Sequence, residues 1–147
     1  MLILSSPPDP TPPLVSVDVP LLVQSVGNLR ESWQARNRRV GRERQTVTTY
    51  LFAQAGRATG PHLTSVHKRL LITFVRRASR RLDDDNLAGG CKGPRDAVAE
   101  WLGVDDGSRR LIWAYDQEPH KRYRNTPSLL IEVRSLDAQG SLFGGAP

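Results

Sequence analysis

The strongest constraint on the fold is the segment at residues 66–75, near the middle of the chain, which ends in a largely apolar run from Leu70 onward. Read as extended backbone, the run carries large apolar residues on both faces. One face holds Leu70, Ile72 and Phe74, and the other holds Leu71, Thr73 and Val75. The pattern therefore predicts a strand that is covered on both sides.

Three further strands are expected. Residues 14–19 alternate well enough for an edge strand, a position that suits the prolines around them. Short β-rich runs at 111–115 and 129–133 indicate two more strands, joined by a basic loop at 120–124. Trp113 falls in phase with its apolar neighbours, so we expect it in the core or in a dimer interface.

Two main helices are expected beside these strands. The first covers roughly residues 43–54; Gly41 separates it from a basic loop, and the glycines at 56 and 60 mark its end. The second begins at Pro94, carries an apolar stripe that includes Trp101, and ends at Gly103. Together the elements predict one small α/β (α+β) domain, a mixed β-sheet packed against two main helices.

Both ends of the chain differ in composition from its middle. Residues 1–20 hold six of the eleven prolines and neither Lys nor Arg, which favours a weakly ordered tail. We therefore expect a folded domain at 21–137 and a flexible C-terminus at 138–147. A single domain of this size has a small core, so an obligate partner subunit would be unsurprising.

Charge and cysteine content narrow the class of protein. Lys and Arg outnumber Asp and Glu by 21 to 15, and most of the positive charge is Arg, whose planar fork suits phosphate. One cysteine, Cys91, excludes an internal disulfide framework and a multi-Cys zinc site. We find neither a secretory signal nor an apolar run long enough for a bilayer. We therefore expect a cytoplasmic protein that binds nucleic acid, with no membrane contact and no organic cofactor.

Acidic residues at two places indicate a metal site. In extended chain Asp83 and Asp85 would project together, and two adjacent carboxylates repel unless a hard cation lies between them. Asp106 arrives one helix later, and a helix packed back along the sheet can return it to the strand end. Three carboxylates without Cys or His favour Mg²⁺ or Mn²⁺ over zinc, and beside many arginines they suit phosphodiester hydrolysis. The alternative is that both clusters are solvated turns.

The order of these residues resembles the RusA family of Holliday junction resolvases. The resemblance covers Arg81-Leu82-Asp83-Asp84-Asp85-Asn86-Leu87, then Lys92, then Asp96-Ala97-Val98, then Trp101-Leu102-Gly103-Val104-Asp105-Asp106. It implies a small α/β homodimer with a mixed sheet. The implied activity is Mg²⁺-dependent, paired nicking of four-way DNA junctions in recombination and repair, often for a phage or prophage. Asp83, Asp85 and Asp106 take the family's essential acidic positions and Lys92 its basic one.

One departure from the family pattern concerns Lys92. More residues separate it from Asn86 than the pattern has, and the glycines at 89, 90 and 93 with Pro94 make one unbroken helix unexpected. Lys92 then either stabilises charge at the scissile phosphate or serves as a backbone-phosphate contact.

Ten further cations are predicted to hold the DNA backbone. They are Arg36, Arg38, Arg39, Arg76, Arg77, Arg80, Arg81, Lys121, Arg122 and Arg124. Two alternatives to the junction resolvase stay open. One is a DNA-binding protein without catalysis, and the other is a nuclease that acts on flaps, forks or packaging intermediates.

Overall fold

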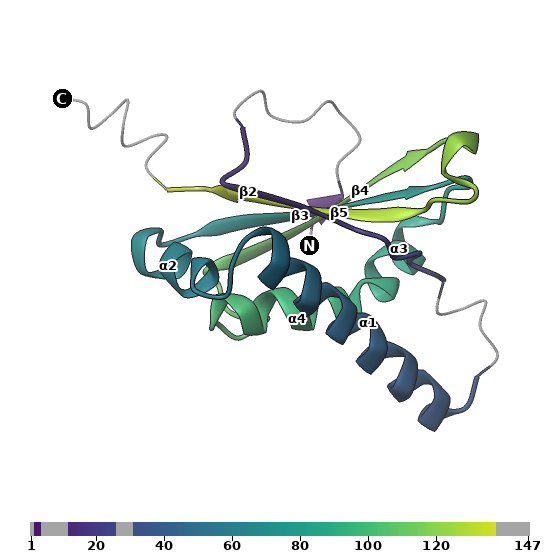
Figure 1. The fold of residues 1–147 in the computed structure, drawn as a ribbon, viewed down its shortest axis with the longest axis horizontal. Helices are drawn as coiled ribbons and strands as arrows, with labels where there is room; N and C mark the ends of the chain where they lie inside the picture. The colour runs from purple at the N-terminus through teal and green to yellow at the C-terminus, as the bar shows by residue number, and fades with distance from the viewer. Residues whose placement is uncertain (1, 4–11, 26–30, 138–147) are drawn as a thin grey trace.

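A mixed β-sheet runs through the molecule in the order β1-β4-β3-β5-β2 (Figure 1). The computed structural model describes residues 2–3, 12–25 and 31–137. Within that part of the chain the sheet has five strands: β1 Leu2–Ile3, β2 Val15–Val19, β3 Leu70–Ala78, β4 Leu111–Pro119 and β5 Ser128–Ser135. The predicted fold, a single small domain with a mixed sheet and helices, is confirmed; the dimer stays a prediction.

The central strand is β3. The prediction that it is covered on both sides is wrong for the described residues, because the helices cover only the face of Leu70, Ile72 and Phe74, and Leu71 and Val75 on the other face are half-buried. It pairs parallel with β4, from Leu70 opposite Leu111 to Ala78 opposite Pro119, and antiparallel with β5. The strand begins at Leu70 and not at 66, because the preceding residues complete a helix. The edge strand expected at 14–19 is confirmed as β2, which pairs antiparallel with β5.

Two long helices, α1 Trp33–Gln54 and α4 Lys92–Leu102, pack together under one face of the sheet (Figure 1). The first begins ten residues before the prediction. Ser32 caps it by accepting a hydrogen bond from the Ala35 amide, and the helix continues through Gly41, where a Cβ would meet nothing within 4 Å. Arginine is a good helix former, so the stretch expected as a basic loop is helical.

The helix α2 Thr59–Val66 was not predicted. The dipeptide Gly60-Pro61 reads as a loop signal, yet it occupies the first turn, where proline needs no amide partner. Gly60 lies so close to α4 that a Cβ there would overlap the carbonyl oxygen of Trp101. The glycine therefore sets how closely α2 and α4 approach.

A short helix, α3 Asp84–Gly90, follows β3 and is separated from α4 by Cys91. The break agrees with the expectation that no continuous helix joins Asn86 to the stripe of α4. The second helix begins at Lys92, so Pro94 lies within its first turn and not at its first residue.

The core lies between the sheet and the helices. Trp101 and Trp113 are both buried, as expected, and Trp113 stacks on Phe74. Two strands, β1 and β2, lie within the stretch 1–20 that we assigned to a tail, and residues 138–147 lie outside the described ranges. No described helix is long and apolar enough to cross a membrane.

Candidate functional site

The first acidic cluster lies at the start of α3. Asp83 is the N-cap: its Oδ1 accepts from the Asn86 amide at 2.8 Å, and its Oδ2 accepts from the Asn86 side-chain nitrogen at 2.8 Å. Asp84 and Asp85 form the first helical turn, where negative charge is favoured by the helix dipole. The extended geometry that we expected through Asp85 is therefore wrong, because the helix begins at Asp84. All three carboxylates are exposed.

The residue before this cluster is held against β4. Gln117 accepts from the Leu82 amide at 2.8 Å and donates from its side-chain nitrogen to the Leu82 carbonyl at 2.7 Å. Leu82 lies beyond the end of β3, and these two hydrogen bonds pair its backbone groups as a neighbouring strand would. It fixes where the chain turns from β3 into α3, and so where Asp83 begins the helix.

The second acidic segment is held against the same strand. The backbone carbonyl of Asp106 accepts from Trp113 Nε1 at 2.9 Å, and its carboxylate lies 3.6 Å from the Arg95 guanidinium. Arg95 in turn donates to the Tyr115 hydroxyl at 3.1 Å. Asp106 is half-buried and already paired with a cation.

These contacts say how near the two segments come. Trp113, Tyr115 and Gln117 alternate along β4, so their side chains leave the sheet on one face. Gln117 lies four positions along the strand from Trp113, a distance of roughly 13 Å. The structure thus brings both acidic segments to one face of β4, with Arg95 attached between their contact points.

The three carboxylates do not meet the requirement of a metal cage as they stand. Among the residues that the structure describes, no group of three or more His, Cys, Asp or Glu side chains is arranged to hold a metal ion. Asp83 bonds to Asn86 and Asp106 pairs with Arg95, so each has another partner. The chemistry of the donors suits Mg²⁺ or Mn²⁺, but in this structure the three carboxylates do not close on one position.

Lys92 opens α4 and is exposed. Its ammonium lies 3.5 Å from Asp96, one helical turn along. The break at Cys91 separates it from α3. Cys91 itself is fully buried, and burial raises the pKa of its thiol to about 12, so it has no nucleophilic character near neutral pH.

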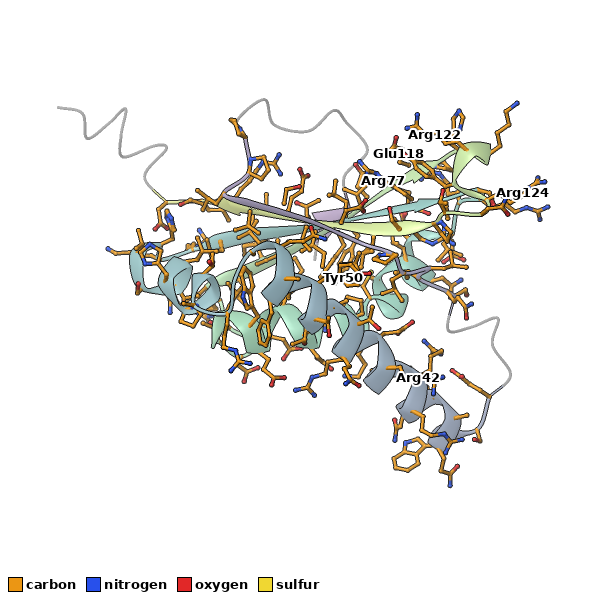
Figure 2. All side chains as sticks on the ribbon, in the orientation of Figure 1. Arg42, Tyr50, Arg77, Glu118, Arg122 and Arg124 are labelled. Atoms are coloured by element: carbon orange, nitrogen blue, oxygen red, sulfur yellow. The ribbon has the colours of Figure 1, made fainter. Side chains whose placement is uncertain are left out.

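The predicted DNA-binding arginines gather at the hairpin end of the sheet. Figure 2 shows Arg77, Arg122 and Arg124 around the β4–β5 connection, which contains the short 3₁₀ helix η1 Lys121–Tyr123. Glu118 neutralises part of this group, because it lies 3.0 Å from Arg77 and 2.7 Å from Arg122. These ion pairs, together with the Tyr123 hydrogen bond, hold the pKa of Glu118 low against the effect of its partial burial.

Arg76 differs from its expected place on the surface. It points to the helix side of β3 and is only 7% exposed. Arg80, Arg81, Lys121 and Arg124 are exposed, as a phosphate-contact role needs. Sequence patterns did not reveal the burial of Arg76, because it depends on a distant segment, residues 20–25, that covers the strand end.

The predicted arginines on α1 also divide. Arg36 and Arg38 are exposed, whereas Arg39 is held between Glu31 at 2.8 Å and Glu43 at 3.3 Å. The first ten residues of α1 include no buried residue, so this half of the helix stands clear of the core. Figure 2 shows Arg42 on this projecting part.

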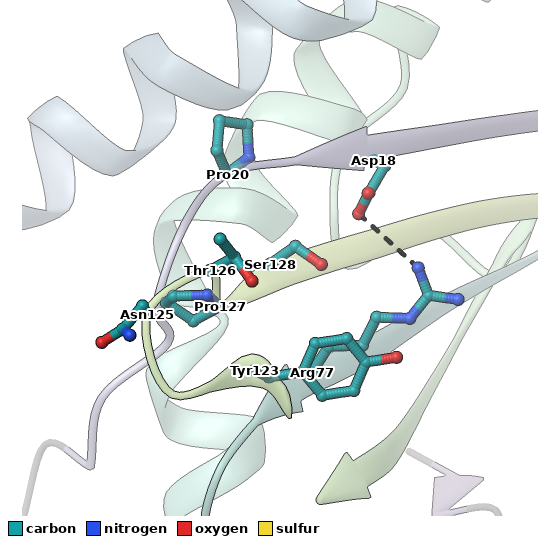
Figure 3. Close-up of a pocket in the computed structure, with 8 residues that line it drawn as sticks. All are labelled: Asp18, Pro20, Arg77, Tyr123, Asn125, Thr126, Pro127 and Ser128. Carbon is teal, nitrogen blue, oxygen red and sulfur yellow. Dashed lines mark ion pairs between the residues drawn. The ribbon is translucent and has the colours of Figure 1, made fainter. Parts of the chain in front are cut away.

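A hollow of about 570 Å³ lies beside the hairpin that joins β4 to β5 (Figure 3). Segments far apart in the sequence form it: Asp18 and Pro20 at the end of β2, Arg77 on β3, and residues 123 and 125–128 of the hairpin. Arg77 lies between Asp18 at 3.9 Å and Glu118, so its charge is already compensated. The sequence has no local signal for this hollow, because its three walls come from separate parts of the chain.

The chain matches no protein-family model. It also matches no curated protein.

Proposed function

We propose that this protein is an endonuclease that cuts branched DNA, with the four-way junction as its substrate. The observation that carries the proposal is the common attachment of the two acidic segments. Leu82 is bonded to Gln117 and the Asp106 carbonyl to Trp113, so the segments that carry Asp83, Asp85 and Asp106 are attached to the same face of β4. The resemblance to RusA-type resolvases, over residues 81–106, assigns these same three carboxylates.

The electrostatic surroundings support a polyanionic substrate. The chain has a net charge of +6, and exposed cations that pair with no acid among the described residues lie where β3 leads into the acidic cluster. Arginine binds phosphate with two parallel donors, and such contacts hold DNA without reading its sequence. Arg80, Arg81 and Arg124 are the cations best placed for this role.

Mg²⁺ or Mn²⁺ is the proposed cofactor, on the chemistry of the oxygen donors alone. Because the carboxylates do not close on one position, no metal-bound geometry is assigned to them. Lys92, the homodimer and paired nicking belong to the same proposal and rest on the resemblance. A cytoplasmic location is proposed from the cysteine content, since a single buried thiol suits a reducing compartment.

The direct test is cleavage of a synthetic four-way junction by the purified protein with and without Mg²⁺. Asp85→Asn removes one proposed site carboxylate, and Asp84→Asn is its matched control, one residue away, exposed and with the same change in charge. We expect Asp85→Asn to lower the cleavage rate at least about 100-fold, a size typical of lost charge stabilisation, and Asp84→Asn to cut normally. Equal cleavage by Asp85→Asn would refute the proposal.

A second candidate is a DNA-binding protein that does not cut. It is favoured by the structural roles that two carboxylates already fill, since Asp83 caps α3 and Asp106 pairs with Arg95. This protein would retain the junction in a mobility shift and leave it intact in Mg²⁺ and in Mn²⁺. The nuclease alternatives are separated by offering flap, fork and four-way substrates side by side, where we expect the four-way junction to be cut fastest.

A further inference from the structure

A second, smaller hollow of about 230 Å³ lies at the end of β3. Its walls are Leu22, residues 76 and 78–80 at and just after the end of β3, and the hairpin at 123, 124 and 127. Three of the lining side chains are guanidiniums, from Arg76, Arg80 and Arg124, and none is a carboxylate. The hollow is therefore a concave surface of one charge sign.

Arg76 is the innermost cation of this hollow. Its Nε donates to the Val23 carbonyl at 2.8 Å and its Nη1 donates to the Arg80 carbonyl at 2.6 Å. Neither partner carries a charge, and burial lowers the pKa of the guanidinium, an effect that Cys91 offsets only in part. A buried cation with only dipolar partners is costly, so an anion placed in the hollow would be favoured.

The two outer cations are free to bind a ligand. In the described part of the chain neither Arg80 nor Arg124 forms an ion pair, and both are exposed. Their neighbours on the other side of the hairpin are different, because Arg77 and Arg122 share Glu118. Among the arginines of the two hollows, those that line the smaller one thus keep charge that no described acid compensates.

This hollow adjoins the acidic segment. Arg76 is the register partner of Gln117 on the neighbouring strand, and Gln117 is the residue that holds Leu82. Adjacent strands lie about 4.8 Å apart, so the hollow and the start of α3 are next to each other on the helix side of the sheet. A strand of nucleic acid lying across the acidic segment would pass the mouth of the hollow.

We propose that the hollow formed by Arg76, Arg80 and Arg124 binds a phosphodiester group of the DNA backbone next to the one at the carboxylates. This inference rests on the proposed function, because it takes DNA as the ligand. The buried Arg76 supplies a fixed positive charge at the inner wall of the hollow, and the exposed Arg80 and Arg124 bind the phosphate oxygens. The subsite sets the path of the strand over α3.

The test measures binding alone, by fluorescence anisotropy of a labelled four-way junction in EDTA, so that nuclease activity does not enter. Arg80→Gln with Arg124→Gln removes the two outer cations. Arg69→Gln with Arg109→Gln is the matched control, with the same change in charge at exposed positions near the opposite end of β3 and β4. Circular dichroism of both variants confirms that they are folded.

We call the Arg80→Gln/Arg124→Gln protein the pocket variant. We expect it to bind the junction at least about tenfold more weakly than wild type, the effect of removing a charged hydrogen bond, and the control to bind within about twofold of wild type. The slope of log K against log salt should become shallower by about 0.9 in the pocket variant, because one phosphate fewer is neutralised. Equal weakening in both variants, or none in either, overturns the subsite while leaving the nuclease proposal standing. If the wild type does not bind the junction, the proposed function fails and the subsite fails with it.

Free phosphate is distinguished from the backbone by competition. Inorganic phosphate at matched ionic strength should displace the junction no better than chloride, because one phosphodiester group acts together with many others along the DNA. Displacement by millimolar phosphate from the wild type, with the pocket variant insensitive, would show a site for the free anion and overturn the assignment to DNA.

Discussion

Gln117→Ala tests how the fold holds the candidate site in place, because it alters none of the proposed carboxylates. Gln117 makes two hydrogen bonds to the backbone of Leu82, of 2.8 and 2.7 Å, from a half-buried position on β4. A typical hydrogen bond contributes about 1 kcal/mol net, and an unsatisfied buried backbone group costs about 1–3 kcal/mol. The substitution is therefore expected to lower the free energy of unfolding by about 2 kcal/mol.

Urea denaturation followed by circular dichroism measures this loss. With an m-value of about 2 kcal/mol/M for a domain of this size, the midpoint should fall by about 1 M. The control is Gln45→Ala on the exposed side of α1, where the change is expected within about 0.5 kcal/mol of wild type. A Gln117→Ala midpoint equal to that of the control would show that Leu82 is not held by Gln117, and the placement of Asp83 derived from it would be wrong.

Three further outcomes follow from the packing and the titrating groups. Gly60→Ala should destabilise the protein by about 1–3 kcal/mol, because the added Cβ would overlap the Trp101 carbonyl. Gly41→Ala adds a Cβ in open space within α1, so it should stabilise the protein by up to about 1 kcal/mol. Equal effects of the two substitutions in thermal denaturation would contradict the close approach of α2 and α4. Burial raises the pKa of Glu43 above its ordinary value of 4.5, and Arg39 offsets this rise only in part. Because the carboxyl group holds its proton more tightly in the folded state than in the unfolded state, the free energy of unfolding falls as the pH rises from about 4.5 through the raised pKa. The stability of Glu43→Gln relative to wild type should therefore increase between pH 4 and pH 7 in urea titrations, and a constant difference would refute the burial argument. The Cys91 thiol should react with a disulfide reagent only in denaturant, and rapid labelling of the folded protein would contradict its burial.

The sheet was predictable from the sequence because its strands carry their own patterns. The two apolar faces of β3 and the short β-rich runs of β4 and β5 need no distant partner to be recognised. The start of α1 was missed because arginines and Gly41 have no apolar period, although they tolerate a helix. The two-residue strand β1 was missed because such a short strand is defined only by its partner, β4.

The sequence predicts the candidate site as a set of residues, which stays a prediction, and it does not predict the geometry of those residues. The order Asp83, Asp85, Asp106 is readable in the chain, but the helical start at Asp84 and the Arg95 pair with Asp106 depend on capping and packing. The burial of Arg76 and the hollow beside it depend on residues 20–25 crossing the end of β3. Interactions of this kind join segments that are distant in the sequence, and local periodicity does not encode them.

The proposed function requires that Asp83 and Asp85 on one segment and Asp106 on another belong to one site. Calorimetric titration of Mn²⁺ into the wild type, Asp85→Asn, Asp106→Asn and the control Asp84→Asn tests it most directly. We expect uptake by the wild type and the control, and loss of uptake when either segment alone is altered. Uptake by Asp106→Asn equal to that of the wild type would contradict it.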